Sequence, residues 1–204
     1  MNPASLLFWA SSFVLLISGV LLPEAISFLR PDYSSIANYI SELGAKDANY
    51  APLINVFSFL PVALSSTIAI LCLRGRCSGN ILAKTGLVLW GIGLSGGYLG
   101  AVLFPCDYGC PAEGSSRQLI HNIAGLVAYP VGTIGLFLLA AGLAQNPATS
   151  KFVVVVAILT AIGFVMMLLP EQADFRGFWQ RLADYSMFLL ILSLGRILPR
   201  TPAP

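Results

Sequence analysis

Charged side chains are scarce in this chain of 204 residues: Asp, Glu, Lys and Arg make up only 10% of it, whereas 57% of the residues are hydrophobic. A soluble domain usually carries about 25% charged residues. With so little polar surface, the composition predicts an integral membrane protein. The net charge is only +2 and no basic stripe is present, which argues against nucleic acid as a partner.

Several motifs of well-characterised proteins are also missing. The sequence has no H-E-x-x-H zinc motif and no phosphate-binding loop. It has no internal repeat of the kind that builds inverted-repeat transporters. His121 is the only histidine. Any chemistry must therefore be assembled from residues in separate segments.

Long apolar segments dominate what the sequence does contain. Six of them are close to the ~20 residues that a helix needs to cross the hydrocarbon core: residues 6–28, 51–73, 81–104, 118–143, 152–169 and 182–198. The first has neither the charged start nor the cleavage site of a signal peptide, so we count it as a span. We therefore expect an all-α, polytopic membrane protein, a six-transmembrane-helix bundle that forms a single integral membrane domain over residues 1–204.

The nine acidic residues all lie on one side of these expected spans. The opposite side consists of two short loops, residues 74–80 and 144–151, and the C-terminal tail. It carries basic residues such as Arg74, Arg76 and Arg200, and no acid. Short basic loops favour the cytoplasmic side of a membrane. We therefore expect both termini in the cytoplasm and the acidic side facing out.

The segment between the first two spans, RPDYSSIANYISELGAKDANY (residues 30–50), is polar and aromatic. Apolar residues recur every three or four positions at Tyr33, Ile36, Ile40 and Leu43, and a polar row has the same spacing at Ser34, Asn38 and Ser41. This pattern predicts an amphipathic helix of about three turns, from Asp32 to Gly44, in the outer membrane interface. Two interpretations stay open: a surface anchor, or a lid whose polar row closes over a site.

Glycines in the third span are spaced for close helix packing. Gly93 and Gly97 are four residues apart, as are Gly96 and Gly100. Glycines at this spacing let helix backbones approach closely in lipid, where no hydrophobic effect drives helices together. We expect this helix to pack against a neighbour.

The loop between the third and fourth spans holds two of the four cysteines. A disulfide between Cys106 and Cys110 is the interpretation we favour, because the loop lies on the expected oxidising side. A metal site made of these cysteines with Asp107 and His121 is the rival. C-x3-C with one distant histidine matches zinc-site spacing poorly, so we expect neither a metal nor another cofactor.

Ionisable residues near the outer ends of the spans are candidates for function. His121 lies one turn into the fourth span, Glu24 near the outer end of the first, and Asp184 at the start of the sixth. A charge inside a membrane is costly, so such residues need a partner or a function. Arg181 lies three residues before Asp184 and can pair with it on one helix face. His121 is the alternative partner.

Three motifs together resemble one family. The stretch YSSIANYISELGA, the loop FPCDYGCP followed by His121, and GFWQRL at the last span resemble the family known as domain of unknown function 998 (DUF998). The resemblance covers about residues 6–198 and implies a six- to seven-pass protein of a bacterial or archaeal cytoplasmic membrane, without an agreed activity. That family often has Glu where Gln180 stands, so this member lacks or relocates one charge. A more distant resemblance is to the Frag1/DRAM/Sfk1 membrane proteins, some linked to lipid-anchor remodelling.

We expect a polar pocket at the outer end of the bundle that binds, or modifies, a membrane lipid or another amphiphile. For catalysis, His121 would act as a general base oriented by Asp184 or Asp107, with Ser34 or Ser41 as a nucleophile if it lies within reach. For binding, Arg181 would hold a phosphate or carboxylate. The other ligand-binding candidates are Asn38, Asp107, Gln180 and Glu24.

Two other functions stay open, as does the oligomeric state. A small transporter or permease would need polar groups near the bilayer midplane. The middles of the spans offer little beyond Ser65, Ser66, Thr67, Ser95 and Thr133. A non-catalytic scaffold would pair its outer polar residues with one another and leave no cavity between them.

Overall fold

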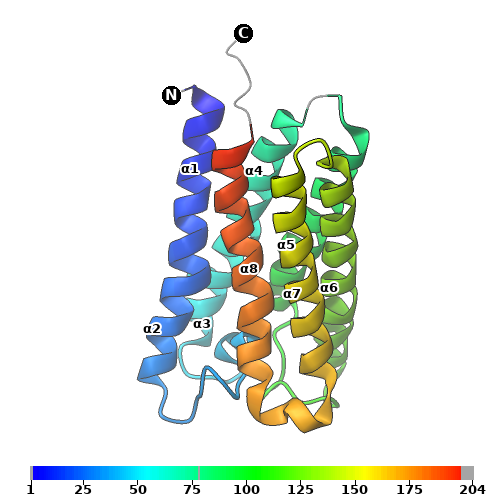
Figure 1. Ribbon diagram of the computed structural model, residues 1–204. Helices are drawn as coiled ribbons and strands as arrows, with labels where there is room; N and C mark the ends of the chain where they lie inside the picture. The colour runs from blue at the N-terminus through cyan, green and yellow to red at the C-terminus, as the bar shows by residue number, and fades with distance from the viewer. Residues whose placement is uncertain (1, 78, 199–204) are drawn as a thin grey trace.

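The computed structural model describes residues 2–77 and 79–198. Its helices run side by side as an elongated bundle, and α1 starts at the same end at which α8 finishes (Figure 1). These residues contain no β-strand. In chain order the elements are α1 (Pro3–Leu16), η1 (Ile17–Leu21), α2 (Leu22–Leu29), η2 (Ile40–Gly44), α3 (Ala51–Ile54), η3 (Asn55–Phe59), α4 (Leu60–Arg76), α5 (Ile81–Leu103), α6 (Ser116–Gly142), α7 (Pro147–Leu168), η4 (Pro170–Phe175) and α8 (Arg176–Ile197).

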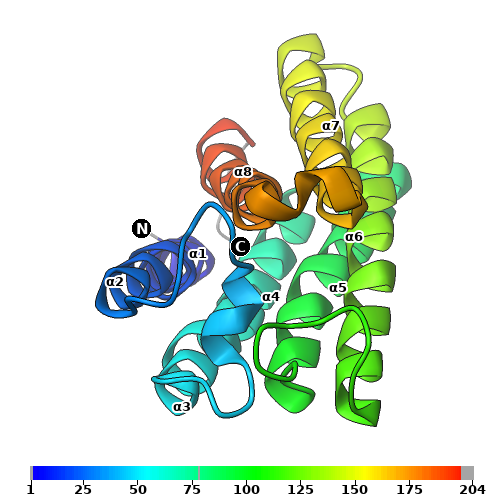
Figure 2. The ribbon, with the colours of Figure 1, turned by 90° about the horizontal axis from the view of Figure 1, so that it is seen from below.

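Six long helical rods make up the bundle. Five of them are long and apolar enough to cross a membrane: Pro3–Leu29, Ala51–Arg76, Ile81–Leu103, Ser116–Gly142 and Pro147–Leu168. The sixth rod, α8, packs along α7 and also contacts α1 and α4 (Figures 1 and 2). The predicted all-α membrane bundle of six helices is confirmed. Arg200, counted above among the basic residues, lies outside the described residues.

The core is aromatic at its centre, and the outer helix faces are apolar as well. Phe8, Phe59, Trp90 and Phe188 are each almost wholly buried. Phe13 and many other leucine, isoleucine and phenylalanine side chains are exposed on the outside of the bundle. An apolar exterior around a packed interior is what a lipid environment requires.

The last helix starts earlier than the sequence predicted. α8 begins at Arg176, whereas hydropathy predicted that it starts at residue 182. Its first turns are polar because they pack against protein: the Phe178 amide donates to the Ile36 carbonyl oxygen at 2.9 Å. At 1.5 Å per residue, Asp184 lies about 12 Å along the helix from Arg176. This buried acid is therefore two turns inside the helix and not at its start.

Helices α5 and α6 form the most extensive pair in the bundle. A Cβ added at Gly93 would lie 2.5 Å from the Ala128 carbonyl oxygen, and one added at Gly97 would lie 3.2 Å from Ala128 Cβ. The predicted role of these two glycines is correct. Gly96 differs, since an added Cβ there would meet open space, and so it takes no part in this packing.

Residues 30–50 do not form the predicted three-turn helix. Turns and bends occupy most of residues 31–38, and only η2 is helical, as a short 3₁₀ helix. Side chains take up the backbone groups that a helix would use. Asn38 Oδ1 accepts from the Ser34 amide at 2.8 Å, and Glu42 Oε1 accepts from the Tyr39 amide at 2.9 Å. The segment instead crosses the end of the bundle opposite the start of α1 (Figure 2). We call this the acidic end, formed by residues 30–50, 104–115 and 169–175.

Candidate functional site

A pocket lies between η2, α5, α6 and α8 below the acidic end, and we call it the inner pocket. Six polar side chains line it: Ser41, Tyr98, His121, Tyr129, Gln180 and Asp184. It offers about 80 Å³ to water-sized molecules, where a single water needs roughly 10–15 Å³. Four of these residues, namely Ser41, His121, Gln180 and Asp184, were predicted from the sequence. The two tyrosines were missed, because tyrosines in apolar spans read as ordinary core residues.

Asp184 is held by both tyrosines. The Tyr98 hydroxyl donates to its Oδ2 at 2.8 Å and the Tyr129 hydroxyl to its Oδ1 at 2.9 Å. The carboxyl is 3% exposed, so these bonds satisfy a group that would otherwise be buried at high cost. Since Tyr98 lies on α5 and Tyr129 on α6, Asp184 joins three helices at one point.

His121 is bonded to the loop before it and not to an acid. Its Nδ1 lies 2.9 Å from the Phe104 carbonyl oxygen. A carbonyl oxygen only accepts hydrogen bonds, so Nδ1 carries the proton and Nε2 of the neutral ring is an acceptor. The bond expected between His121 and Asp184 or Asp107 is therefore replaced by a backbone contact.

Arg181 pairs with Glu24. The partner expected from the sequence was Asp184, and that pairing is wrong. Arg181 Nε lies 2.7 Å from Glu24 Oε1, and its Nη2 donates to the Tyr33 hydroxyl at 2.9 Å. A further bond joins its Nη1 to the Asn38 carbonyl oxygen at 3.2 Å. Burial raises the pKa of Tyr33 to about 12, so its hydroxyl stays neutral. Glu24, Asn38 and Arg181 thus form a network that fastens residues 30–44 to α2 and α8, beside the inner pocket.

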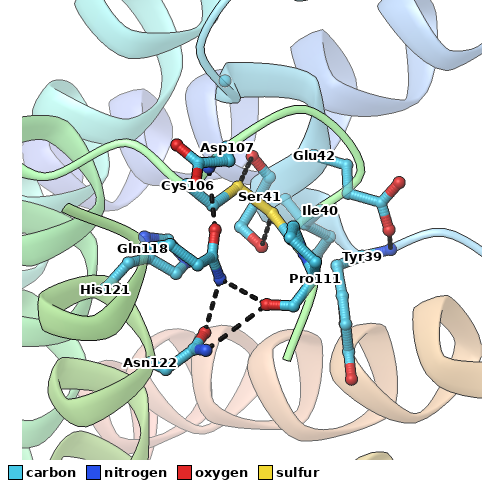
Figure 3. Close-up of a disulfide and its surroundings, with 12 residues drawn as sticks. Tyr39, Ile40, Ser41, Glu42, Cys106, Asp107, Pro111, Gln118, His121 and Asn122 are labelled. Carbon is cyan, nitrogen blue, oxygen red and sulfur yellow. Dashed lines mark hydrogen bonds between the residues drawn. A yellow bond between two sulfur atoms is a disulfide. The ribbon is translucent and has the colours of Figure 1, made fainter. Parts of the chain in front are cut away.

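The loop after α5 carries the predicted disulfide, which joins Cys106 to Cys110 (Figure 3). Gln118 holds this loop: its Nε2 donates to the Pro111 carbonyl oxygen and its Oε1 accepts from the Asp107 amide, both at 2.7 Å. Gln118 is wholly buried, and its only signal in the sequence is weak, a glutamine at the start of an apolar helix.

Asp107 and Ser34 have local structural roles. The amide and hydroxyl of Ser115 both donate to the Asp107 carboxylate at 2.8 Å and lower its pKa below the usual range. Ser34 is exposed, and its hydroxyl accepts from the Ile36 amide at 3.3 Å. Neither residue lines the inner pocket. The structure therefore brings together Ser41, His121, Gln180 and Asp184, and leaves the other predicted residues outside.

One cluster has the composition of a metal site. The sulfur atoms of Cys106 and Cys110 and a ring nitrogen of His121 all lie within 4.8 Å of one another. Thiolates are the metal ligands of cysteine, so as a disulfide this pair offers none. Reduction of the bond would be needed before these three residues could hold an ion.

A second cavity adjoins the first, and we call it the outer groove. It shares Ser41, His121, Gly125, Tyr129 and Gln180 with the inner pocket. The apolar part of its lining comes mainly from α6 and α7, with Leu119, Ile123, Leu126, Phe164, Met167 and Leu168. It offers about 420 Å³ to water-sized molecules. Several wall residues are exposed on the outside of the bundle, so the groove opens toward the surrounding lipid.

A row of polar residues on α8 leads from the mouth of the groove into the inner pocket. Arg176, Gln180 and Asp184 are spaced four apart and share one helix face. Gln180 Oε1 accepts from the Ile40 amide at 2.6 Å, and Arg176 lines the groove. Arg176 was not among the predicted site residues, because hydropathy predicted that the last helix starts after it.

Comparison with known proteins supports the family assignment. The family described as protein of unknown function (DUF998) matches residues 13–197. This chain belongs to the DUF998 family. Searches of characterised proteins and of solved structures found no match. Nothing in these comparisons supports the more distant resemblance to the Frag1/DRAM/Sfk1 proteins.

This DUF998 protein also contains one match to the G-x-S-x-G nucleophile motif, from Gly93 to Gly97. In enzymes with that motif the serine stands at a sharp strand-to-helix turn. Here Ser95 lies inside α5, and its hydroxyl is 2.8 Å from the Ser66 hydroxyl. The motif therefore marks helix packing and not a nucleophile.

Proposed function

We propose that this DUF998 protein binds a lipid or another amphiphile at the acidic end of the bundle. The polar part of the molecule lies beside Ser41, His121 and Gln180, where the inner pocket meets the outer groove, and the apolar part lies in the outer groove. The observation that carries the proposal is that two adjoining cavities share Ser41, His121 and Gln180, with further polar groups in the inner pocket and leucine and isoleucine side chains along the outer groove. An amphiphile needs both surroundings side by side.

The position of the groove fits a ligand that enters from the bilayer. Leu119, Ile123 and Leu126 on α6 and Leu168 on α7 are all exposed on the helix faces that line it. A ligand from the membrane would exchange one apolar environment for another, so its apolar part contributes little binding free energy. Selectivity would come instead from the polar groups of the inner pocket.

We also propose an orientation, with the acidic end facing away from the cytoplasm. The short loops at the other end carry Arg74, Arg76 and Lys151 and no acid, which is the pattern of cytoplasmic loops. The disulfide between Cys106 and Cys110 at the acidic end fits an oxidising compartment. In this orientation the ligand comes from the outer leaflet of a bacterial or archaeal membrane.

Binding is the function we propose, ahead of catalysis. His121 Nε2 is able to accept a proton, which a general base requires. A serine nucleophile would also need a hydrogen bond to that base. The Ser41 hydroxyl instead lies 3.4 Å from Cys110 Sγ, and no hydrogen bond joins it to His121 within the described part of the chain.

A glycine-to-leucine pair tests the proposal. A Cβ added at Gly125 or at Gly96 meets nothing within 4 Å, so both positions accept a side chain, but only Gly125 lines the two cavities. Native mass spectrometry of protein purified from membranes should detect a bound amphiphile in the wild type and in Gly96→Leu. Gly125→Leu should lose it. Failure to find any bound amphiphile, or full retention in Gly125→Leu, would refute the proposal.

A further inference from the structure

Arg176 is half-buried in the lining of the outer groove, and one of its hydrogen-bond donors has no partner among the described residues. Its Nε atom is shielded from solvent and has no hydrogen-bond partner. Its guanidinium lies over the ring of Tyr39, whose centre is 5.8 Å away. A guanidinium carries five N–H donors in a planar fork that matches phosphate and carboxylate. Leaving the shielded Nε–H without a partner is costly.

The other cations at the acidic end either form ion pairs or are exposed to solvent. Arg30 pairs with Asp32, Lys46 with Asp47 and Arg181 with Glu24. Arg117 is exposed to solvent. Over residues 2–77 and 79–198, Arg176 is thus the half-buried cation at this end that forms no ion pair at contact distance, although the charge of Glu42 acts on it from farther away.

The nearby acid Glu42 is already engaged. Its Oε1 accepts from the Tyr39 amide and its Oε2 from Asn38 Nδ2, both at 2.9 Å. No ion pair joins Glu42 to Arg176 among the described residues. The guanidinium is therefore held in place by an aromatic ring and has its charge available for a ligand.

We propose that Arg176 binds the phosphate of a lipid whose acyl chains lie in the outer groove. This inference rests on the proposed function and names its ligand class. It moves the anion-binding role from Arg181, which Glu24 occupies, to Arg176. Ser41 adds a second donor on the same groove, since among the described residues its hydroxyl is paired with a sulfur atom alone, a weak acceptor. Several donors around one mouth suit the oxygens of a phosphate better than the two oxygens of a carboxylate.

The test compares a lipid with and without its phosphate, and adds a carboxylate as a third probe. Purified protein in detergent micelles would be titrated with dioleoyl phosphatidate, with dioleoylglycerol and with oleate, and binding followed by native mass spectrometry. The wild type should bind phosphatidate about tenfold more tightly than dioleoylglycerol, as expected for one charge-assisted contact. Arg176→Gln should abolish this preference, and Arg176→Lys should keep part of it. Arg117→Gln is the matched control and should leave the preference unchanged.

The possible failures are distinguishable. Equal affinity of the wild type for phosphatidate and dioleoylglycerol, or a preference that survives in a folded Arg176→Gln variant, overturns the role of Arg176 but leaves amphiphile binding in place. Tighter binding of oleate than of phosphatidate overturns the choice of phosphate. Absence of binding to all three probes overturns the proposed function, and this inference with it.

Discussion

Arg181 ties residues 30–44 of the acidic end to α2 and α8. Its guanidinium contacts Glu24 on α2 and Tyr33 and Asn38 in the segment between α2 and α3. The residue is 8% exposed, so each of these bonds lies in surroundings where an unpaired charge is costly.

Replacement of Arg181 by glutamine should therefore lower the free energy of unfolding by roughly 3 kcal/mol, because Glu24 loses its counter-charge in a partly buried site. Chemical unfolding in mixed micelles measures the free energy of unfolding of both proteins. Removal of both charges, in Glu24→Gln with Arg181→Gln, should cost less than the sum of the two single changes. Additive losses would show that the two residues do not act as a pair.

Glu42 gives a prediction about pH. Burial raises the pKa of its carboxyl above the usual 4.5. A raised pKa in the folded protein means that this group favours folding below about pH 4.5, and that the contribution is lost as the pH rises through the folded-state value. Relative to wild type, Glu42→Gln should become more stable between pH 4 and pH 7 in the same unfolding measurement. A stability difference that stays constant over this range would contradict the assignment.

At the scale of elements, the seam between α5 and α6 shapes the inner pocket from one side. Gly93 and Gly97 bring the two helices together near Ala128, and Gly125 leaves space beside them. Tyr98 and Tyr129 reach Asp184 from these two helices. The close approach of the helices therefore also places both hydroxyls on one carboxylate.

Gly93→Leu should destabilise the protein by about 3 kcal/mol, because a side chain at this position meets the α6 backbone, which has no room to move aside. Gly96→Leu is the control on the same helix and should have a free energy of unfolding close to wild type. Equal stability of the two variants would show that α5 and α6 do not pack through Gly93.

The sequence could predict the elements that a local pattern of residues specifies. Apolar length identified the long helices, and the glycine spacing identified Gly93 and Gly97. The three-turn helix between the first two spans was wrong, because periodicity does not register that Asn38 and Glu42 bond the backbone themselves. Partners far apart in the chain, such as Arg181 with Glu24, could not be chosen from sequence, since several pairings satisfied the same charges.

For the whole molecule, the distribution of charge predicts the orientation in the membrane. A C-terminal fusion to green fluorescent protein should fluoresce in a bacterial host, whereas a C-terminal fusion to alkaline phosphatase should be inactive, because that enzyme needs an oxidising compartment. Phosphatase fused within the exposed loop at Asp47 should be active. The reverse pattern would place the acidic end in the cytoplasm.

An experimental structure of the protein crystallised from a lipid phase tests the central claim most directly. The account predicts non-protein density that starts beside Ser41, His121 and Gln180 in the inner pocket and continues between α6 and α7 along the outer groove. Side chains that close both cavities, with no density beyond ordered water, would contradict it.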